Sequence, residues 1–348
     1  MATAPAVGAL TVVTVTTTDD GGAGSLREAF ATADASSPDA VEIVLTTGAE
    51  YVLDDCGEGA LSHTASNALT VTGNGSTVRQ TCAGERVITN VGSAGHLTVS
   101  GVTITGGNVG DLTAGGGIGA TSDGLTILNS TITGNSAGSG GAVFVTGGGD
   151  VTVVNSTITA NVATSDTGGG GIEAQGDATL VYATVVGNTA GGTDEPANVR
   201  TGGDLVSFGS VLATPLGTDA LNCIVTGSTT SQGYNFSDDA SCDLTGVGDT
   251  QNGGDPALGP LADNGGGTPT MVPEIFGPLV DKIPLEACHV DGITADQRGL
   301  PRPGESITSC GGTPVFLHCD IGAVEDQYSL QAQCAVAPPL VIPPAFTG

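Results

Sequence analysis

Segments rich in β-branched residues recur at a nearly constant spacing. The segments LTVSGVTITGG, LTILNSTITGN, VTVVNSTITAN and ATLVYATVVGN begin at Leu97, Leu125, Val151 and Ala178, so the steps are 28, 26 and 27 residues. A period of 20 to 50 residues is typical of solenoids, and the alternation of aliphatic and polar residues indicates strands rather than helices. We therefore predict an all-β, right-handed, single-stranded parallel β-helix. The same step places further segments at Val13, Val41, Leu69 and Leu205.

Within each unit, aliphatic residues such as Ile132 and Ile158 alternate with threonines, so the aliphatic side chains are expected to fill the bore. A Gly-Gly stretch then leads to a second short strand at Ile118, Val143 and Ile172. An asparagine stands between the two strands. Because side chains at equivalent positions stack in a solenoid, the amides can bond along the column. The predicted ladder consists of Asn108, Asn135, Asn161 and Asn188.

The sequence GSLREA at residues 24–29 predicts a short helix that closes the first end of the bore. Ser25 and Glu28 stand three residues apart, as in a capping box. Arg27 is expected to be a surface residue beside the cap rather than a catalytic one. Four apolar residues make one face: Leu26, Ala29, Phe30 and Ala33. Four regions follow: an N-terminal strand and capping helix (1–36), the coils (37–245), a C-terminal capping extension (246–334) and a proline-rich linker (335–348) that we expect to lead to an anchor.

The eight cysteines form an even set without zinc-ligand spacing, which favours disulfides and an oxidising compartment. We predict the pairs Cys56–Cys82 and Cys223–Cys242. The other four cysteines allow three connectivities, and they are Cys288, Cys310, Cys319 and Cys334. The N-terminus lacks the pattern of a signal peptide, so we expect a mature, secreted or cell-surface protein whose signal peptide has been removed.

The formal charge of −29 arises from 36 acidic residues against seven cationic ones. Such a surface disfavours nucleic acids and anionic membranes, since both are bound through Lys and Arg. A uronate lyase would also need cations, and a glycosidase needs two convergent carboxylates, so we expect no catalytic residues. In the C-terminal region, Lys282, Arg298 and Arg302 are expected to pair with Asp296 or Asp320.

Two further columns suggest binding surfaces. Asp150, Asp177 and Asp204 each follow a glycine at intervals of 27 residues, so they either turn the chain or hold Ca²⁺, the one cofactor that we consider. Threonine pairs on successive coils could form an ice-binding array. Those pairs are Thr103 and Thr105, Thr131 and Thr133, and Thr157 and Thr159.

The segment VTVTTTDDGGAGSLREAF resembles the CSLREA motif found ahead of bacterial surface β-helices, with Gly24 in place of the leading cysteine. The stretches DPALGPLADNGGGTPT, DQRGLPRP and CDIGAVE resemble a choice-of-anchor Q domain, and ITGNSAGSGGAV resembles repeats of chlamydial polymorphic outer-membrane proteins. Together the resemblances cover most of residues 11–325. They imply export and surface attachment, and they carry no catalytic residues.

The predicted function is a non-catalytic extracellular structural or adhesion module that is monomeric and binds a surface glycan or protein. A carbohydrate-active enzyme is the first alternative, and an ice- or Ca²⁺-binding surface protein is the second. The longest loop, TAGGTDEPANVRTGGD at residues 189–204, is the expected place of partner contact.

Overall fold

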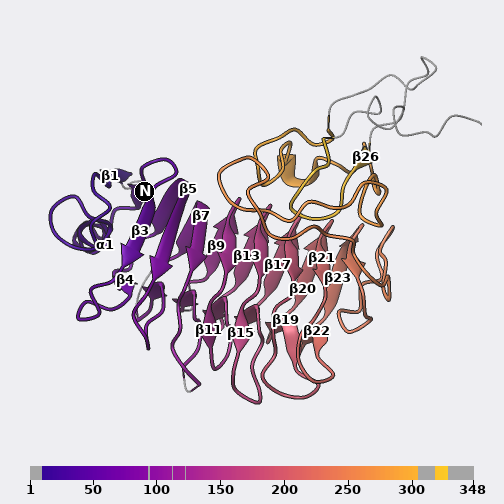
Figure 1. The fold of residues 1–348 in the computed structure, drawn as a ribbon, viewed down its shortest axis with the longest axis horizontal. Helices are drawn as coiled ribbons and strands as arrows, with labels where there is room; N and C mark the ends of the chain where they lie inside the picture. Colours follow the sequence, from indigo (N-terminus) through magenta and orange to yellow (C-terminus); the bar gives the residue numbers. More distant parts are fainter. Residues whose placement is uncertain (1–9, 93–94, 112, 122, 305–317, 328–348) are drawn as a thin grey trace, which may run out of the picture.

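The computed structural model describes residues 10–92, 95–111, 113–121, 123–304 and 318–327. In this part the chain winds into a parallel β-solenoid of about eight turns (Figure 1). One α-helix, α1 (Leu26–Ala35), lies at the first end of the described part. The predicted fold class is therefore confirmed.

The largest sheet has two halves, because β5 (Leu69–Gln80) and β7 (Leu97–Thr105) run through both. The first half also contains β1 (Thr11–Thr14), β2 (Val41–Val44), β9 (Leu125–Leu128), β13 (Val151–Val154), β17 (Ala178–Val181), β20 (Leu205–Phe208) and β23 (Thr229–Gly233). The second half contains β3 (Glu50–Leu53), β10 (Thr131–Thr133), β14 (Thr157–Thr159), β18 (Thr184–Val186), β21 (Val211–Ala213) and β24 (Phe236–Ser237).

A second parallel sheet covers another side of the solenoid, and we call it the B sheet. Its strands, in order, are β4 (Leu61–His63), β6 (Ile88–Asn90), β8 (Ile118–Ala120), β12 (Val143–Val145), β16 (Ile172–Ala174), β19 (Pro196–Thr201) and β22 (Leu221–Val225). Two small pairs complete the structure: β11 (Ser136–Ala137) with β15 (Val162–Ala163), and the antiparallel β25 (Ile283–Pro284) with β26 (His318–Cys319). A 3₁₀ turn spans Val290–Gly292.

The strand register follows the repeat. Leu97 lies opposite Leu125 and Leu69, and the steps to Val151, Ala178 and Leu205 are in register as predicted. The first step is different, because Val41 pairs with Thr11 and not with Val13. Helix α1 lies within this first turn and makes it two residues longer than the 28-residue step predicted from the repeat.

Helix α1 closes the bore as predicted. The Ser25 hydroxyl accepts a hydrogen bond from the Glu28 N–H at 3.2 Å, and the Glu28 carboxylate reaches back to the Gly24 N–H. Arg27 is fixed beside the cap by an ion pair with Asp20 at 2.6 Å. The predicted apolar face is buried over the first coils and consists of Leu26, Ala29, Phe30 and Ala33.

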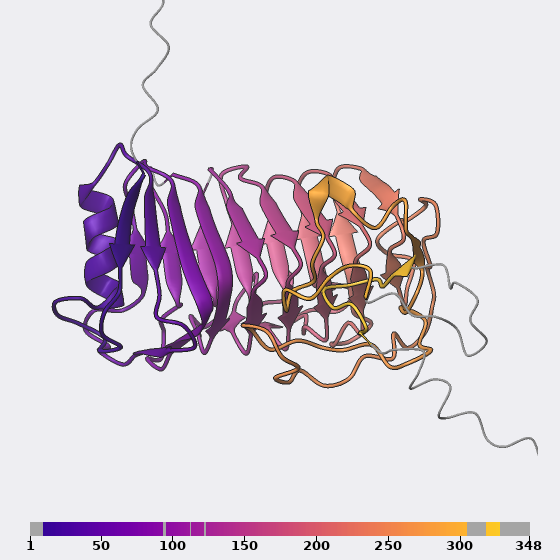
Figure 2. The same ribbon diagram turned by 90° about the horizontal axis from the view of Figure 1, so that it is seen from above.

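The described part of the C-terminal extension, residues 246–304 and 318–327, folds back along one side of the later coils (Figures 1 and 2). It packs there because outward-facing positions of these coils become apolar. Val181, Phe208 and Val211 form a second hydrophobic cluster with residues of the extension. The residues contributed by the extension include Leu279, Ile283 and Ile321.

Three disulfides are present in the described part. Cys56 is bonded to Cys82 and Cys223 to Cys242, as predicted. Cys288 is bonded to Cys319, which selects one of the connectivities that the sequence left open. Cys310 and Cys334 lie outside the described residues, as does the predicted linker at 335–348. Disulfides are typical of proteins from an oxidising compartment. Within the described part, no helix is long and apolar enough to span a membrane.

Candidate functional site

The asparagine ladder forms, but its members differ from the prediction. The Asn135 amide donates to Oδ1 of Asn161 at 3.0 Å, and the Asn161 amide donates to Oδ1 of Asn188 at 3.0 Å. Asn108 is exposed and lies outside the ladder. Its coil contains one additional glycine, so Gly107 takes the ladder position and donates its N–H to Oδ1 of Asn135 at 3.0 Å.

Two buried asparagines that the sequence analysis missed extend the ladder. The Asn188 amide donates to Oδ1 of Asn198 at 2.9 Å, and the Asn198 amide donates to Oδ1 of Asn222 at 2.7 Å. Each precedes a core residue of the B sheet, at a position where earlier coils carry Gly171 or Ala142. The side-chain amides of the ladder bond to one another inside the protein, so the ladder is structural.

The aspartate column is also engaged with the backbone. Oδ1 of Asp150 accepts the N–H of Asp177, and Oδ1 of Asp177 accepts the N–H of Asp204, both at 2.8 Å. Hydrogen bonds from the N–H and the hydroxyl of Ser228 lower the pKa of Asp204. Within the described residues, no group of three or more His, Cys, Asp or Glu is arranged to hold a metal ion. The carboxylates of Asp150 and Asp177 thus each bind the backbone of the following coil.

The prediction of an exposed threonine array is wrong for the column that contains Thr131 and Thr157. The Thr131 hydroxyl donates to the Pro269 carbonyl at 2.6 Å, and the Thr157 hydroxyl donates to Gln297 at 2.7 Å. The extension covers this half of the sheet, and Thr103 and Thr159 are buried as well. Thr105 and Thr133 remain half-buried, so no flat array of threonine pairs is open to solvent along these strands.

His63 and Asp34 join the cap helix to the first coils. Nδ1 of the buried His63 lies 2.6 Å from the Asp34 carboxylate, and Nε2 lies 2.9 Å from the Asn67 carbonyl. Burial raises the pKa of Asp34, but hydrogen bonds from Thr64, His63 and Ala65 outweigh it and lower the pKa below its usual value. Both ring nitrogens thus bind protein groups, which indicates a structural role.

The two arginines of the extension form ion pairs inside it, whereas Lys282 forms no ion pair with Asp296 or Asp320 among the described residues. Arg298 pairs with the buried Asp296 at 2.8 Å, as predicted. Arg302 is fully buried and pairs with Glu325 at 3.1 Å, whereas it reaches only the backbone carbonyl of Asp320. Its guanidinium also lies 4.0 Å from the centre of the Tyr182 ring on the solenoid. These contacts fix the extension to the coils.

The buried acids predict an unusual dependence of stability on pH. Burial and the negative charge of Glu325 raise the pKa of Asp320, and burial raises that of Glu325 despite Arg302. A raised folded-state pKa means that the folded protein binds more protons, so this contribution to stability is lost as pH rises through that pKa.

We therefore expect the melting temperature to rise as the pH is lowered through the raised pKa values of Asp320 and Glu325. At still lower pH it should fall again, because Asp20, Asp34 and Asp239 have lowered pKa values and lose their hydrogen-bonded charge there. Thermal unfolding of the wild type and Asp320→Asn across this range measures the effect. An equal slope in both proteins would contradict this assignment.

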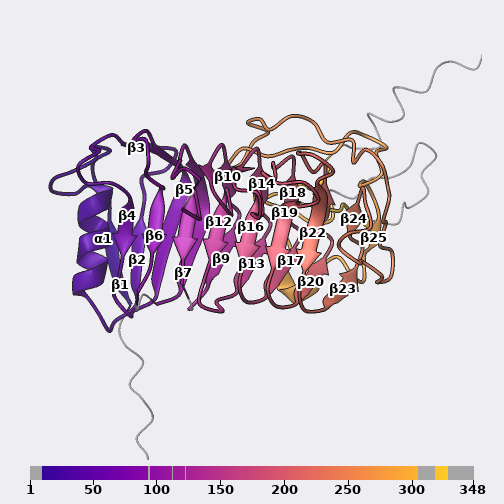
Figure 3. The ribbon, with the colours of Figure 1, turned by 90° about the horizontal axis from the view of Figure 1, so that it is seen from below.

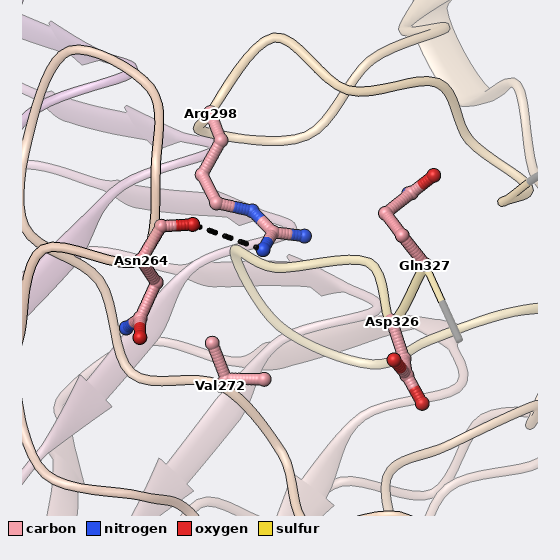
Figure 4. A pocket seen from close by; sticks show the side chains of 5 residues that line it. All are labelled: Asn264, Val272, Arg298, Asp326 and Gln327. Atoms are coloured by element: carbon pink, nitrogen blue, oxygen red, sulfur yellow. Dashed lines mark hydrogen bonds between the residues drawn. The ribbon is translucent and has the colours of Figure 1, made fainter. Parts of the chain in front are cut away.

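A hollow of about 350 Å³ lies in the extension and is lined by Asn264, Val272, Arg298, Asp326 and Gln327 (Figure 4). Its one guanidinium is already engaged. Arg298 binds Asp296 through Nε at 3.0 Å and through Nη2, and Nη1 donates to the Asn264 carbonyl at 3.4 Å. The arginine therefore holds the loops together and has little left to offer a ligand.

No other described segment lies across the B sheet (Figure 3). Residues of its strands alternate between the bore and the surface, so every strand contributes one outward position to a single column. At the centre of the column the half-buried Phe144 lies between Gly119 and Glu173. The column, in order, is Ser62, Thr89, Gly119, Phe144, Glu173, Arg200 and Ile224.

The loop predicted to contact a partner contributes to this sheet. Residues 196–201 of the 189–204 segment form β19 instead of an irregular loop. Arg200 points outward from β19 and pairs with Glu195 of the same segment. Glu173 is held by the Ser139 hydroxyl and by the Gly169 N–H. The charged groups at this end of the column therefore have partners.

Arg86 is not part of the outward column of the B sheet, but its side chain lies against that column at Gly119. It precedes β6, and a Cβ atom on Gly119 would lie 2.9 Å from its Cζ and would clash with Nη1. The guanidinium thus occupies the space that a side chain at position 119 would fill. Burial lowers the pKa of Arg86, and the nearby negative charge of Glu85 offsets this only in part.

No family model, curated protein or solved structure matches this chain.

Proposed function

We propose that the protein is a non-catalytic structural and adhesion module that is secreted or attached to a cell surface, and that the B sheet is its binding face. The observation that carries the proposal is the uncovered column along this sheet, which places Arg86, Phe144 and Glu173 side by side. The opposite side is occupied by the extension. A long, regular and open face suits an extended ligand.

The remaining polar groups support a structural role. The asparagine and aspartate columns bind the backbone of neighbouring coils, and the buried ions of the cap and the extension bind each other. Such groups stiffen the solenoid, because their partners lie within the fold. Export agrees with the disulfides and with the resemblance to CSLREA and choice-of-anchor Q sequences.

A glycan array, supplemented with immobilised extracellular proteins, tests the proposal. We expect retention of the protein on one class of glycan, without release of reducing ends or unsaturated sugars when the bound glycans are incubated with it. Release of either product would show an enzyme and contradict the non-catalytic role. Absence of binding to every glycan and protein would contradict the adhesion role.

A further inference from the structure

We propose that Arg86, lying in the notch at Gly119, is a carboxylate-binding subsite of the B sheet, and that the ligand is an oligosaccharide in which one sugar is acidic and the others are neutral. Phe144 is the adjacent platform for a sugar ring. This inference rests on the proposed adhesion function and names the ligand class of the same face.

Of the chain's six arginines, Arg86 differs from the other five in its lack of an acidic partner within the described part of the chain. Arg27, Arg79, Arg200, Arg298 and Arg302 each form an ion pair with an acidic side chain. Within the described residues, Arg86 alone forms neither an ion pair nor a hydrogen bond through its guanidinium. It is half-buried, and Glu85 influences it only through its charge. A partly desolvated guanidinium without a partner is a strong site for a carboxylate, because its planar N–H groups match the two oxygens.

The notch places this charge beside an aromatic ring. Gly119 and Phe144 are register partners on neighbouring strands, which lie about 4.8 Å apart. Since the guanidinium fills the position of the missing side chain at 119, it and the Phe144 ring occupy consecutive positions of one column. A sugar ring can lie on the aromatic face while its carboxylate reaches Arg86.

The surrounding charge selects a ligand with a single acid. The net charge of −29 repels polyanions, and Glu173 follows Phe144 in the column, where it would repel a second carboxylate. An extended peptide is less suited to this face. The B-sheet strands flanking the notch are paired on both sides, so a peptide cannot gain main-chain hydrogen bonds by adding a strand there. An oligosaccharide with one acidic sugar does not need main-chain hydrogen bonds, because its hydroxyl groups can bond to outward side chains.

Titration calorimetry with two probes tests the subsite: a cello-oligosaccharide ending in glucuronate, and the same oligosaccharide ending in glucose. At about 0.15 M salt, remote charges are largely screened. We expect the wild type to bind the glucuronate probe about tenfold or more tighter, as a charge-assisted hydrogen bond predicts. Arg86→Gln should abolish this difference.

A second variant keeps the charge but moves it. Gly119→Ser should displace the guanidinium, because the atoms that clash are the far end of a flexible side chain, and it should also abolish the preference. Arg79→Gln is the matched control, since it removes one charge from an exposed pair with Glu50 on another sheet. It should leave the preference unchanged, and thermal melting of all variants confirms folding.

Equal affinity of the wild type for the two probes, or an equal preference in Arg86→Gln and Arg79→Gln, would overturn the subsite. If the wild type binds neutral glycans on the array yet ignores the carboxylate, the subsite is wrong and the adhesion function stands. If it binds no glycan and no immobilised protein, both are wrong.

Discussion

Asn161→Ala is expected to lower the free energy of unfolding by about 3 to 5 kcal/mol. Asn161 is fully buried, donates to the carbonyls of Ile132 and Thr159, and is bonded to the ladder amides on both sides. Alanine leaves these buried groups without partners, and each costs about 1 to 3 kcal/mol. Urea unfolding followed by circular dichroism measures the loss.

Asn108→Ala is the matched control for the ladder. The same repeat position was predicted for Asn108, but its side chain is exposed and accepts only the N–H of Gly110 at 3.3 Å. We expect its stability to change by less than about 0.5 kcal/mol. A similar loss in both variants would contradict the view that the ladder, rather than asparagine at a turn, stabilises the coils.

Arg302→Met is expected to cost about 3 to 5 kcal/mol, because it leaves a buried carboxylate without its counter-charge. Arg302 is fully buried, bonds Glu325 and the Gly322 carbonyl, and lies over Tyr182 of the solenoid. Its loss should therefore loosen the extension before the coils. Melting curves combined with limited proteolysis measure this, and the first cuts are expected within the described part of the extension.

Arg79→Met provides the comparison for Arg302. The pair of Arg79 with Glu50 is exposed on both sides, and water and salt screen such pairs. Its melting temperature and cleavage pattern should match those of the wild type. If Arg302→Met behaves in the same way, the buried ion pair does not hold the extension in place.

The coils could be predicted from the sequence because local alternation fixes which residues face the bore. Leu97, Leu125 and Val151 are in the predicted register for this reason. The errors arise where the repeat length changes. One additional glycine moves Asn108 out of the ladder, and helix α1 shifts the first turn by two residues.

The covering of the threonine column could not be predicted, because it depends on contacts between residues about 140 positions apart, such as Thr157 and Gln297. A sequence signal did exist: the outward residues Val181 and Phe208 are apolar where earlier coils carry Thr72 and Ser100. The subsite at Arg86 also escaped detection, since it depends on one arginine reaching across to the glycine of the next coil.

The most direct test of the central claim, that the B sheet is the binding face, is hydroxyl-radical footprinting of the protein with and without a glycan that it retains on the array. The account predicts protection of Phe144 and its neighbours on β12 and β16, with unchanged labelling of exposed residues in the extension, such as Phe276. Protection confined to the extension, with Phe144 labelled equally in both samples, would contradict it.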